Sequence, residues 1–271
     1  MNIKFLSLAS GSSGNCYYLS DGKTSVLIDG GLGIRSVKKI FKEYSLSLEE
    51  IKAVFVTHDH ADHIKAVGHL ANKHNLPIYT TNEVHEGIQK SYCMTEKLSS
   101  EHKKIINKGE SVTVGSIEIT CFDVPHDSTD NVGYHIKIGE KYFTFITDVG
   151  RITPVISEYV KNTDYLVMEA NYDMTMLANG PYPTHLKERI ASGNGHLCNK
   201  ELARFIADNF TPRLKNLWLC HLSKDNNHPE LALKTIESAL NEKGIAIDKD
   251  IKVIPLRRTS PTGIFDISTN K

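Results

Sequence analysis

The stretch that decides the fold is Ala53-Val54-Phe55-Val56-Thr57-His58-Asp59-His60-Ala61-Asp62-His63. An apolar strand runs directly into a cluster of histidines and aspartates. If the strand continues, His58 and His60 project from one side of it, because side chains alternate along a strand with period two. Asp62 and His63 then fall on the turn into a helix that starts near Ile64. Ligand-binding residues of α/β sheets commonly collect at such strand ends.

The residue types in this cluster indicate a site for divalent transition metals. Imidazole and carboxylate ligands suit zinc or manganese, and also iron, without any cysteine. Leaving so many polar groups beside a buried strand without a cation would cost free energy. The alternative is a solvated loop that happens to be rich in histidine. We favour the metal site because the pattern H-x-H-x-D-H directly follows an apolar strand.

This segment resembles the signature of the metallo-β-lactamase superfamily, and further parts of that pattern follow in order. Each is a histidine or aspartate at the end of an apolar stretch: Asp29, His126, Asp148 and His221. The resemblance implies an α/β fold of the metallo-β-lactamase type, an αββα sandwich of two mixed sheets flanked by helices. It covers most of the chain.

The resemblance also implies the ligands of two metal ions. One ion would bind His58, His60 and His126, and the other would bind Asp62, His63 and His221. Asp148 would bridge the two ions, and Asp29 would orient the ligand loop from behind. The implied chemistry is hydrolysis by a water that the two ions activate, with Asp62 and Asp148 counted among the catalytic residues.

Short apolar strands alternate with amphipathic helices along the whole sequence, which favours an α/β sandwich. The pattern predicts one helix over residues 64–73 and another over 200–209, with Asn199 as the N-cap of the second. No linker or repeat interrupts the pattern. We therefore expect one domain over residues 1–271.

The composition bears on which charged partners the protein attracts and on where in the cell we expect it. The 271 residues are 40% hydrophobic and carry a formal net charge of zero, so there is no overall attraction to nucleic acid or anionic membranes. No stretch has the length of a membrane span, and the first residues do not read as a signal peptide. The five cysteines are scattered and odd in number, which predicts reduced thiols and a cytoplasmic protein.

Three polar loops indicate which branch of the superfamily this is. They are the Ser-Gly-Ser-Ser-Gly-Asn loop at 10–15, the Gly-His-Leu-Cys-Asn stretch at 195–199, and the loop after His221. Together they resemble the YycJ/WalJ family of bacterial nucleases, although Cys198 stands where we expect serine. That resemblance implies a metal-dependent phosphodiester hydrolase, a 5′→3′ exonuclease on double-stranded DNA linked to mismatch repair. The side chains we expect at substrate phosphates are Ser12, Ser13, Asn15, His196 and Lys224.

Among these residues, His196 is also the candidate for stabilising the phosphoryl oxygen or protonating the leaving oxygen, because it precedes a helix.

Two other functions stay open. A small-molecule hydrolase of the same fold, such as a thioesterase or lactonase resembling glyoxalase II, would use the same ligands. A non-catalytic scaffold or signalling protein would have lost ligands, and none is lost. We expect no role in chemistry for His69, His74, His85, His102 and His135.

Overall fold

The computed structural model describes residues 2–94 and 96–268, whose strands form two sheets of seven strands each. The first sheet has the order β14 (Ile264–Ser268), β1 (Asn2–Ala9), β2 (Cys16–Ser20), β3 (Ser25–Ile28), β4 (Ile51–Phe55), β5 (Ile78–Thr80) and β6 (Lys103–Ile105). The second has the order β13 (Lys252–Pro255), β12 (Asn216–Cys220), β11 (Tyr165–Glu169), β10 (Lys141–Ile146), β9 (Val132–Ile138), β8 (Ile117–Asp123) and β7 (Ser111–Val114). Both sheets are mixed: β3 to β6 and β10 to β13 are parallel, and the remaining neighbours are antiparallel.

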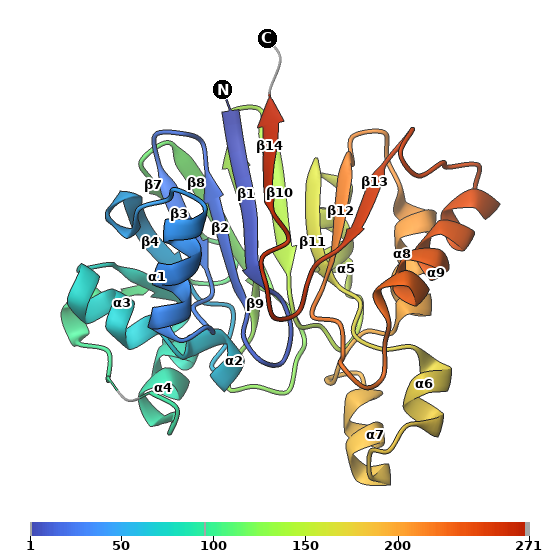
Figure 1. The fold of residues 1–271 in the computed structure, drawn as a ribbon, viewed down its shortest axis with the longest axis horizontal. Helices are drawn as coiled ribbons and strands as arrows, with labels where there is room; N and C mark the ends of the chain where they lie inside the picture. The colour runs from blue at the N-terminus through green and yellow to red at the C-terminus, as the bar shows by residue number, and fades with distance from the viewer. Residues whose placement is uncertain (1, 95, 269–271) are drawn as a thin grey trace.

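Helices cover the outer face of each sheet (Figure 1). On the first sheet lie α1 (Ile34–Glu43), α2 (Ala61–Ile64), α3 (Val67–His74) and α4 (Asn82–Lys90), and on the second lie α5 (Pro154–Lys161), α8 (Asn199–Asn209) and α9 (Pro229–Glu242). Two short helices, α6 (Met174–Asn179) and α7 (Thr184–Ile190), stand below the second sheet in this view. The predicted αββα sandwich is thus confirmed. Among the helices described, none is both long and apolar enough to cross a membrane.

The two sheets enclose a core of large side chains from both halves of the chain. Phe5 of β1 packs on Trp218 of β12 with ring centroids 4.5 Å apart, and on Phe145 of β10 at 5.9 Å. All three rings are fully buried. Burial on this scale is the main favourable term in folding, and here it fixes the strand ends of one sheet relative to those of the other.

The helix predicted over 64–73 is in fact two helices, α2 and α3, separated near Ala66. In a continuous helix, the amide of Ala66 would donate to the carbonyl of Asp62. That carbonyl instead accepts from Asn15 N at 2.7 Å, and Ala66 N donates to Gly30 O at 2.7 Å. Contacts with distant segments therefore replace helical hydrogen bonds beside the histidine cluster.

The predicted N-cap of α8 was wrong by one residue. Cys198, not Asn199, is the N-cap, and its Sγ accepts from the amide of Glu201 at 3.4 Å. Serine would accept this hydrogen bond more strongly than cysteine does. The side chain at position 198 therefore caps the N-terminus of α8. Three short elements, β6, β14 and α6, were not predicted from the sequence.

His135 on β9 yields a prediction about stability. Its Nδ1 lies 2.8 Å from Thr144 Oγ1, and burial, together with nearby Arg213, lowers its pKa from 6.5 to about 4. Since protonation is favoured only in the unfolded chain, stability should fall as the pH falls from about 6.5 to about 4. Compared with His135→Phe, the native chain should lose on the order of 2 kcal/mol more over that interval.

Urea unfolding of the two proteins in EDTA, at several pH values, measures this difference. Taking the difference between the two curves removes the titration of the other histidines. Parallel curves would contradict a neutral, buried His135.

Candidate metal centre

The histidine cluster lies at one edge of the sandwich, where strands of both sheets end. His58 follows β4 of the first sheet, and Asp148 and His221 follow β10 and β12 of the second. A bridge between His58 and Asn131 joins the two sheets at this edge. The side chain of Asn131 donates to the carbonyl of Asp148 at 2.9 Å. The sandwich therefore brings residues that are far apart in sequence to one place.

His58, His60 and His126 form one group whose ligand atoms all lie within 4.8 Å of one another. A hydrogen bond orients each ring. His126 Nδ1 donates to Gly195 O at 2.8 Å, His60 Nε2 donates to Asp127 O at 3.2 Å, and His58 Nδ1 lies 3.0 Å from Thr57 Oγ1. In each ring the other nitrogen is thereby left for a cation.

Asp62, His63 and His221 form a second group of the same size. Asp62 Oδ2 lies 3.3 Å from His221 Nε2 and 3.6 Å from His63 Nε2. Behind them, Asp29 Oδ2 accepts from His63 Nδ1 at 2.8 Å. A carboxylate behind a histidine is the usual way to orient a metal ligand, and this is the place predicted for Asp29.

Asp148 lies between the two groups. Its Oδ1 is 3.1 Å from His221 Nδ1 and 3.7 Å from His126 Nε2, and its Oδ2 is 3.2 Å from His63 Nε2. Its side chain is 2% exposed. The structure thus brings together all seven side chains predicted as ligands, six of them in the two groups that the resemblance implied and Asp148 between those groups.

The buried atoms of this centre fit divalent cations. His58 Nε2, His126 Nε2 and Asp148 Oδ2 are buried and have no hydrogen-bond partner, although the last lies close to His63. An unpaired buried polar atom costs about 1–3 kcal/mol. Bound cations would give these three atoms the partners that the protein does not provide. The ligand groups contain nitrogen and oxygen donors and no sulfur, as zinc or manganese accept.

The titration of the centre follows from its burial and its charges. Burial disfavours the charged imidazole of His63, but the carboxylates of Asp29, Asp148 and Asp62 outweigh it and raise its pKa to about 10. At His58, burial and the neighbouring His63 hold the pKa well below its usual value. Cations would therefore displace protons from His63, so their affinity should rise with pH.

Glu169, the last residue of β11, is a residue of the centre that was not predicted from the sequence. Its fully buried carboxylate accepts from His196 Nδ1 at 2.7 Å and from His221 Nδ1 at 3.0 Å, through Oε1. Its Oε2 accepts from the amides of Val149 and Leu197. Glu169 thus orients both histidines. The signal was present, because Tyr165–Glu169 is another apolar strand that ends in a carboxylate.

The residues predicted to contact phosphate have different surroundings. Ser12, Ser13 and Lys224 are exposed on their loops, and the His196 side chain is 19% exposed. Asn15 is fully buried, and its amide lies 2.9 Å from His63 Nε2 and 3.2 Å from Asp62 Oδ2. Asn15 therefore lies against two metal-ligand candidates, and its contact with a phosphate stays a prediction.

Residues 24–216 match the family described as beta-lactamase superfamily domain. Exodeoxyribonuclease YycJ of Bacillus anthracis is 33% identical over 264 residues, 97% of this chain and 99% of that protein. The chain belongs to the metallo-β-lactamase superfamily. Exodeoxyribonuclease WalJ of Streptococcus pneumoniae is 34% identical over 98% of this chain and 99% of its own length. The resemblance to YycJ and WalJ read from the sequence is thus confirmed.

The metallo-β-lactamase fold protein YhfI from Bacillus subtilis has a similar structure, with a TM-score of 0.70 at 19% identity, covering 98% of this chain and 100% of YhfI. At that identity the likeness concerns the fold alone. Membership of the metallo-β-lactamase superfamily, together with the clustered histidines and carboxylates, makes this chain a metal-dependent hydrolase.

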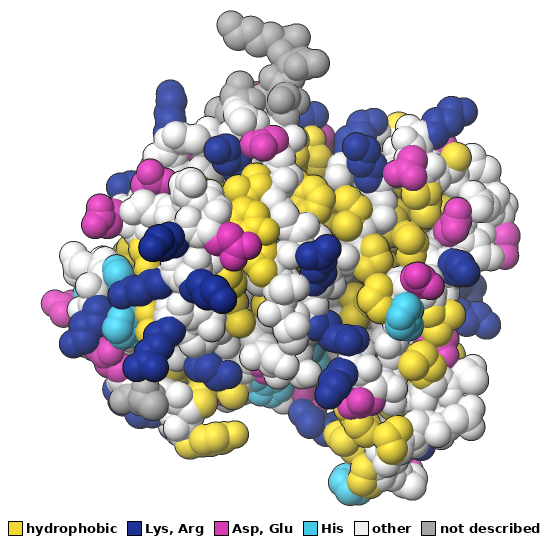
Figure 2. All heavy atoms as spheres, viewed as in Figure 1, with side chains coloured by type: hydrophobic (Ala, Val, Ile, Leu, Met, Phe, Trp, Pro, Cys, Tyr) yellow, Lys and Arg dark blue, Asp and Glu magenta, His cyan; other side chains and the backbone are white. Residues whose placement is uncertain are grey.

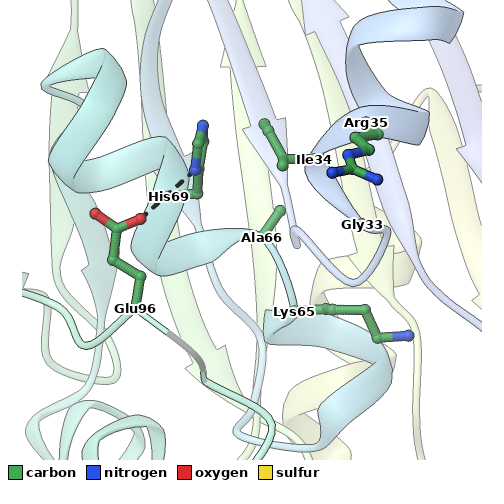
Figure 3. Close-up of a pocket in the computed structure, with 7 residues that line it drawn as sticks. All are labelled: Gly33, Ile34, Arg35, Lys65, Ala66, His69 and Glu96. Atoms are coloured by element: carbon green, nitrogen blue, oxygen red, sulfur yellow. Dashed lines mark ion pairs between the residues drawn. The ribbon is translucent and has the colours of Figure 1, made fainter.

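Histidine side chains are visible in a hollow at the lower edge of the molecule, between the side that carries α4 and the side that carries α7, with Lys and Arg side chains around it (Figure 2). A separate cavity of about 300 Å³ lies between the start of α1 and the segment that joins α2 to α3 (Figure 3). Arg35 and Lys65 line it on either side of Gly33, and His69 pairs there with Glu96 at 3.5 Å. It contains none of the seven ligand candidates.

Proposed function

We propose that this chain is an exonuclease that hydrolyses double-stranded DNA from its 5′ ends with the help of two divalent metal ions. The observation that carries the proposal is that Asp148 lies between the two ligand groups, with His196 beside it. Two relatives that match nearly the full chain are named exodeoxyribonucleases, which supports DNA as the substrate. The neutral net charge leaves binding to local groups around the centre.

The seven ligand candidates would hold the ions, and zinc and manganese suit these donors. Bound there, the ions would lower the pKa of a water molecule and neutralise charge on a phosphoryl oxygen. The carboxylate of Asp148 lies against histidines of both groups and fixes their spacing. Asp29 and Glu169 hold His63 and His221 from behind.

His196 is placed to supply a proton to the leaving oxygen. Its Nδ1 is engaged by Glu169, so its other nitrogen is left for the substrate. Burial disfavours the imidazolium, but the carboxylate of Glu169 outweighs this effect and raises the pKa of His196. A raised pKa favours the charged imidazolium, which is the form that a general acid requires.

Replacing His196 with alanine should lower kcat by about 10²–10⁴-fold without loss of metal, because only the proton donor is removed. Glu169→Gln should lower kcat less and shift the alkaline limb of the pH–rate profile, where His196 loses its proton, to lower pH, since a neutral amide stabilises the imidazolium poorly. Steady-state rates across pH, with metal content from atomic emission, measure both. An unchanged rate for His196→Ala would remove it from the mechanism.

The function itself is tested with end-labelled single- and double-stranded DNA and RNA, with zinc or manganese added separately. We expect nucleotides to be released from the 5′ ends of duplex DNA. A thioester and a lactone are included as competing substrates. Hydrolysis of these with no release of nucleotides would favour a small-molecule hydrolase instead, and no hydrolysis of any substrate by metal-loaded protein would favour a scaffold.

The cellular location and the biological role of this activity are part of the same proposal. We place the enzyme in the cytoplasm, in DNA mismatch repair, as the resemblance to YycJ and WalJ implies. We also propose that the chain is one domain, because the core between the sheets takes side chains from β1 and from β12 alike. Deleting the gene and measuring the mutation rate would test the repair role.

A further inference from the structure

The end of α7 is tied to both sides of the metal centre. His196 N donates to Ile190 O at 2.8 Å, and a side chain on Gly195 would collide with Arg189 O, 2.1 Å from its Cβ position. Gly195 O in turn accepts from His126 Nδ1. The last turn of α7 is therefore packed against the loop that orients a ligand candidate and carries the general-acid candidate.

Arg189 projects from this turn toward the centre. Its Nε donates to Asp127 Oδ2, and the other oxygen of that carboxylate, Oδ1, lies 3.4 Å from His126 Nε2. One carboxylate thus separates the guanidinium from the open nitrogen of a ligand candidate. Asp127 also accepts from His60 through its carbonyl, so its backbone is fixed at the centre.

The guanidinium of Arg189 is only partly used. Within the described residues, neither of its terminal nitrogens has a hydrogen-bond partner, and its side chain is 56% exposed. Arg151, on the same rim, differs: its Nη1 donates to Gly193 O at 2.8 Å and to Asn194 Oδ1. Arg151 therefore secures the loop, whereas Arg189 presents free donors at the mouth of the centre.

We propose that Arg189 binds a phosphate of the DNA strand at the metal centre, and that Asp127 holds its guanidinium in place for this contact. A guanidinium offers planar paired donors that match two phosphate oxygens. Nε stays on Asp127, and the terminal nitrogens engage the phosphate. The inference rests on the proposed nuclease function and adds to it a residue that positions the substrate.

The test measures binding of a short 5′-phosphorylated DNA duplex in EDTA, where hydrolysis and metal content play no part. Arg189→Met should weaken binding roughly 10- to 100-fold, the loss of one charged hydrogen-bonded contact. It should also reduce the slope of log K against log salt by about 1. Arg189→Lys should restore the slope. Arg204→Met on α8, whose side chain is 86% exposed, is the matched control and should change neither quantity.

Asp127→Asn distinguishes two roles for Arg189, contact with a phosphate and a purely structural role in holding α7 in place. The amide oxygen of asparagine can still accept from Arg189 Nε and hold the guanidinium, while a negative charge beside the DNA is removed, so binding should stay the same or become tighter. If Asp127→Asn and Arg189→Met weaken binding equally with an unchanged salt slope, Arg189 is an anchor and the inference is overturned. An unaltered affinity of Arg189→Met also overturns it. Whether the native enzyme degrades DNA is a separate readout, so failure of the nuclease function would be recognised independently.

Discussion

Replacing Asp148 with alanine should abolish hydrolysis while the chain stays folded. The carboxylate lies against His63, His221 and His126, and so it serves both ligand groups at once. Metal ions supply several kcal/mol of transition-state stabilisation, so their loss should lower kcat/KM by more than about 10³-fold. Metal content after dialysis should fall well below that of the native protein, as atomic emission would measure.

Asp123→Asn is the matched control. Asp123 also ends a strand of the second sheet, β8, but its side chain is 58% exposed and pairs with Lys108. This variant should keep metal and activity. Circular dichroism shows whether each variant is folded. Full activity of a folded, metal-loaded Asp148→Ala protein would exclude a centre in which this carboxylate serves two ions.

Gly31→Ala should destabilise the fold and the metal centre together. A Cβ at Gly31 would lie 1.6 Å from the carbonyl oxygen of Asp62 and 2.8 Å from Asn15 N. Both atoms are backbone and are bound to each other at 2.7 Å, so neither has room to move. We expect a loss of at least about 3 kcal/mol in the free energy of unfolding, the range of severe core changes, and weaker metal binding.

Gly33→Ala provides the comparison, since no atom lies within 4 Å of its Cβ position and its φ is −63°. It should change the free energy of unfolding by less than about 1 kcal/mol. Urea unfolding of the two variants in EDTA isolates the backbone clash from metal binding. Equal stabilities would show that the loop at Gly31 is looser than its contacts indicate.

The seven ligand candidates were predictable because each belongs to a local pattern, an apolar strand that ends in a histidine or aspartate, and because their order matches a superfamily. Glu169 shares that pattern, but its partners depend on the parallel pairing of β11 with β12, which brings Glu169 opposite Cys220. The sequence around Glu169 has no neighbouring histidine to mark it.

Other features depend on contacts that a linear pattern does not contain. The break between α2 and α3 arises because Asn15 takes the carbonyl of Asp62 and Gly30 takes the amide of Ala66. The role of Arg189 arises because α7 packs beside the loop of His126. Helical periodicity continues through residues 64–73 whether or not a distant loop competes for the backbone.

The pairing of β14 with β1 has a consequence for biosynthesis. Ile264–Ser268 lies alongside Asn2–Ala9, a strand that is translated about 255 residues earlier. During translation β1 therefore exposes an open edge until β14 is made, and open edges invite association between chains. His221 is also translated late, so the group of Asp62, His63 and His221 is complete only when most of the chain has been made. Metal insertion in this enzyme should therefore be essentially post-translational.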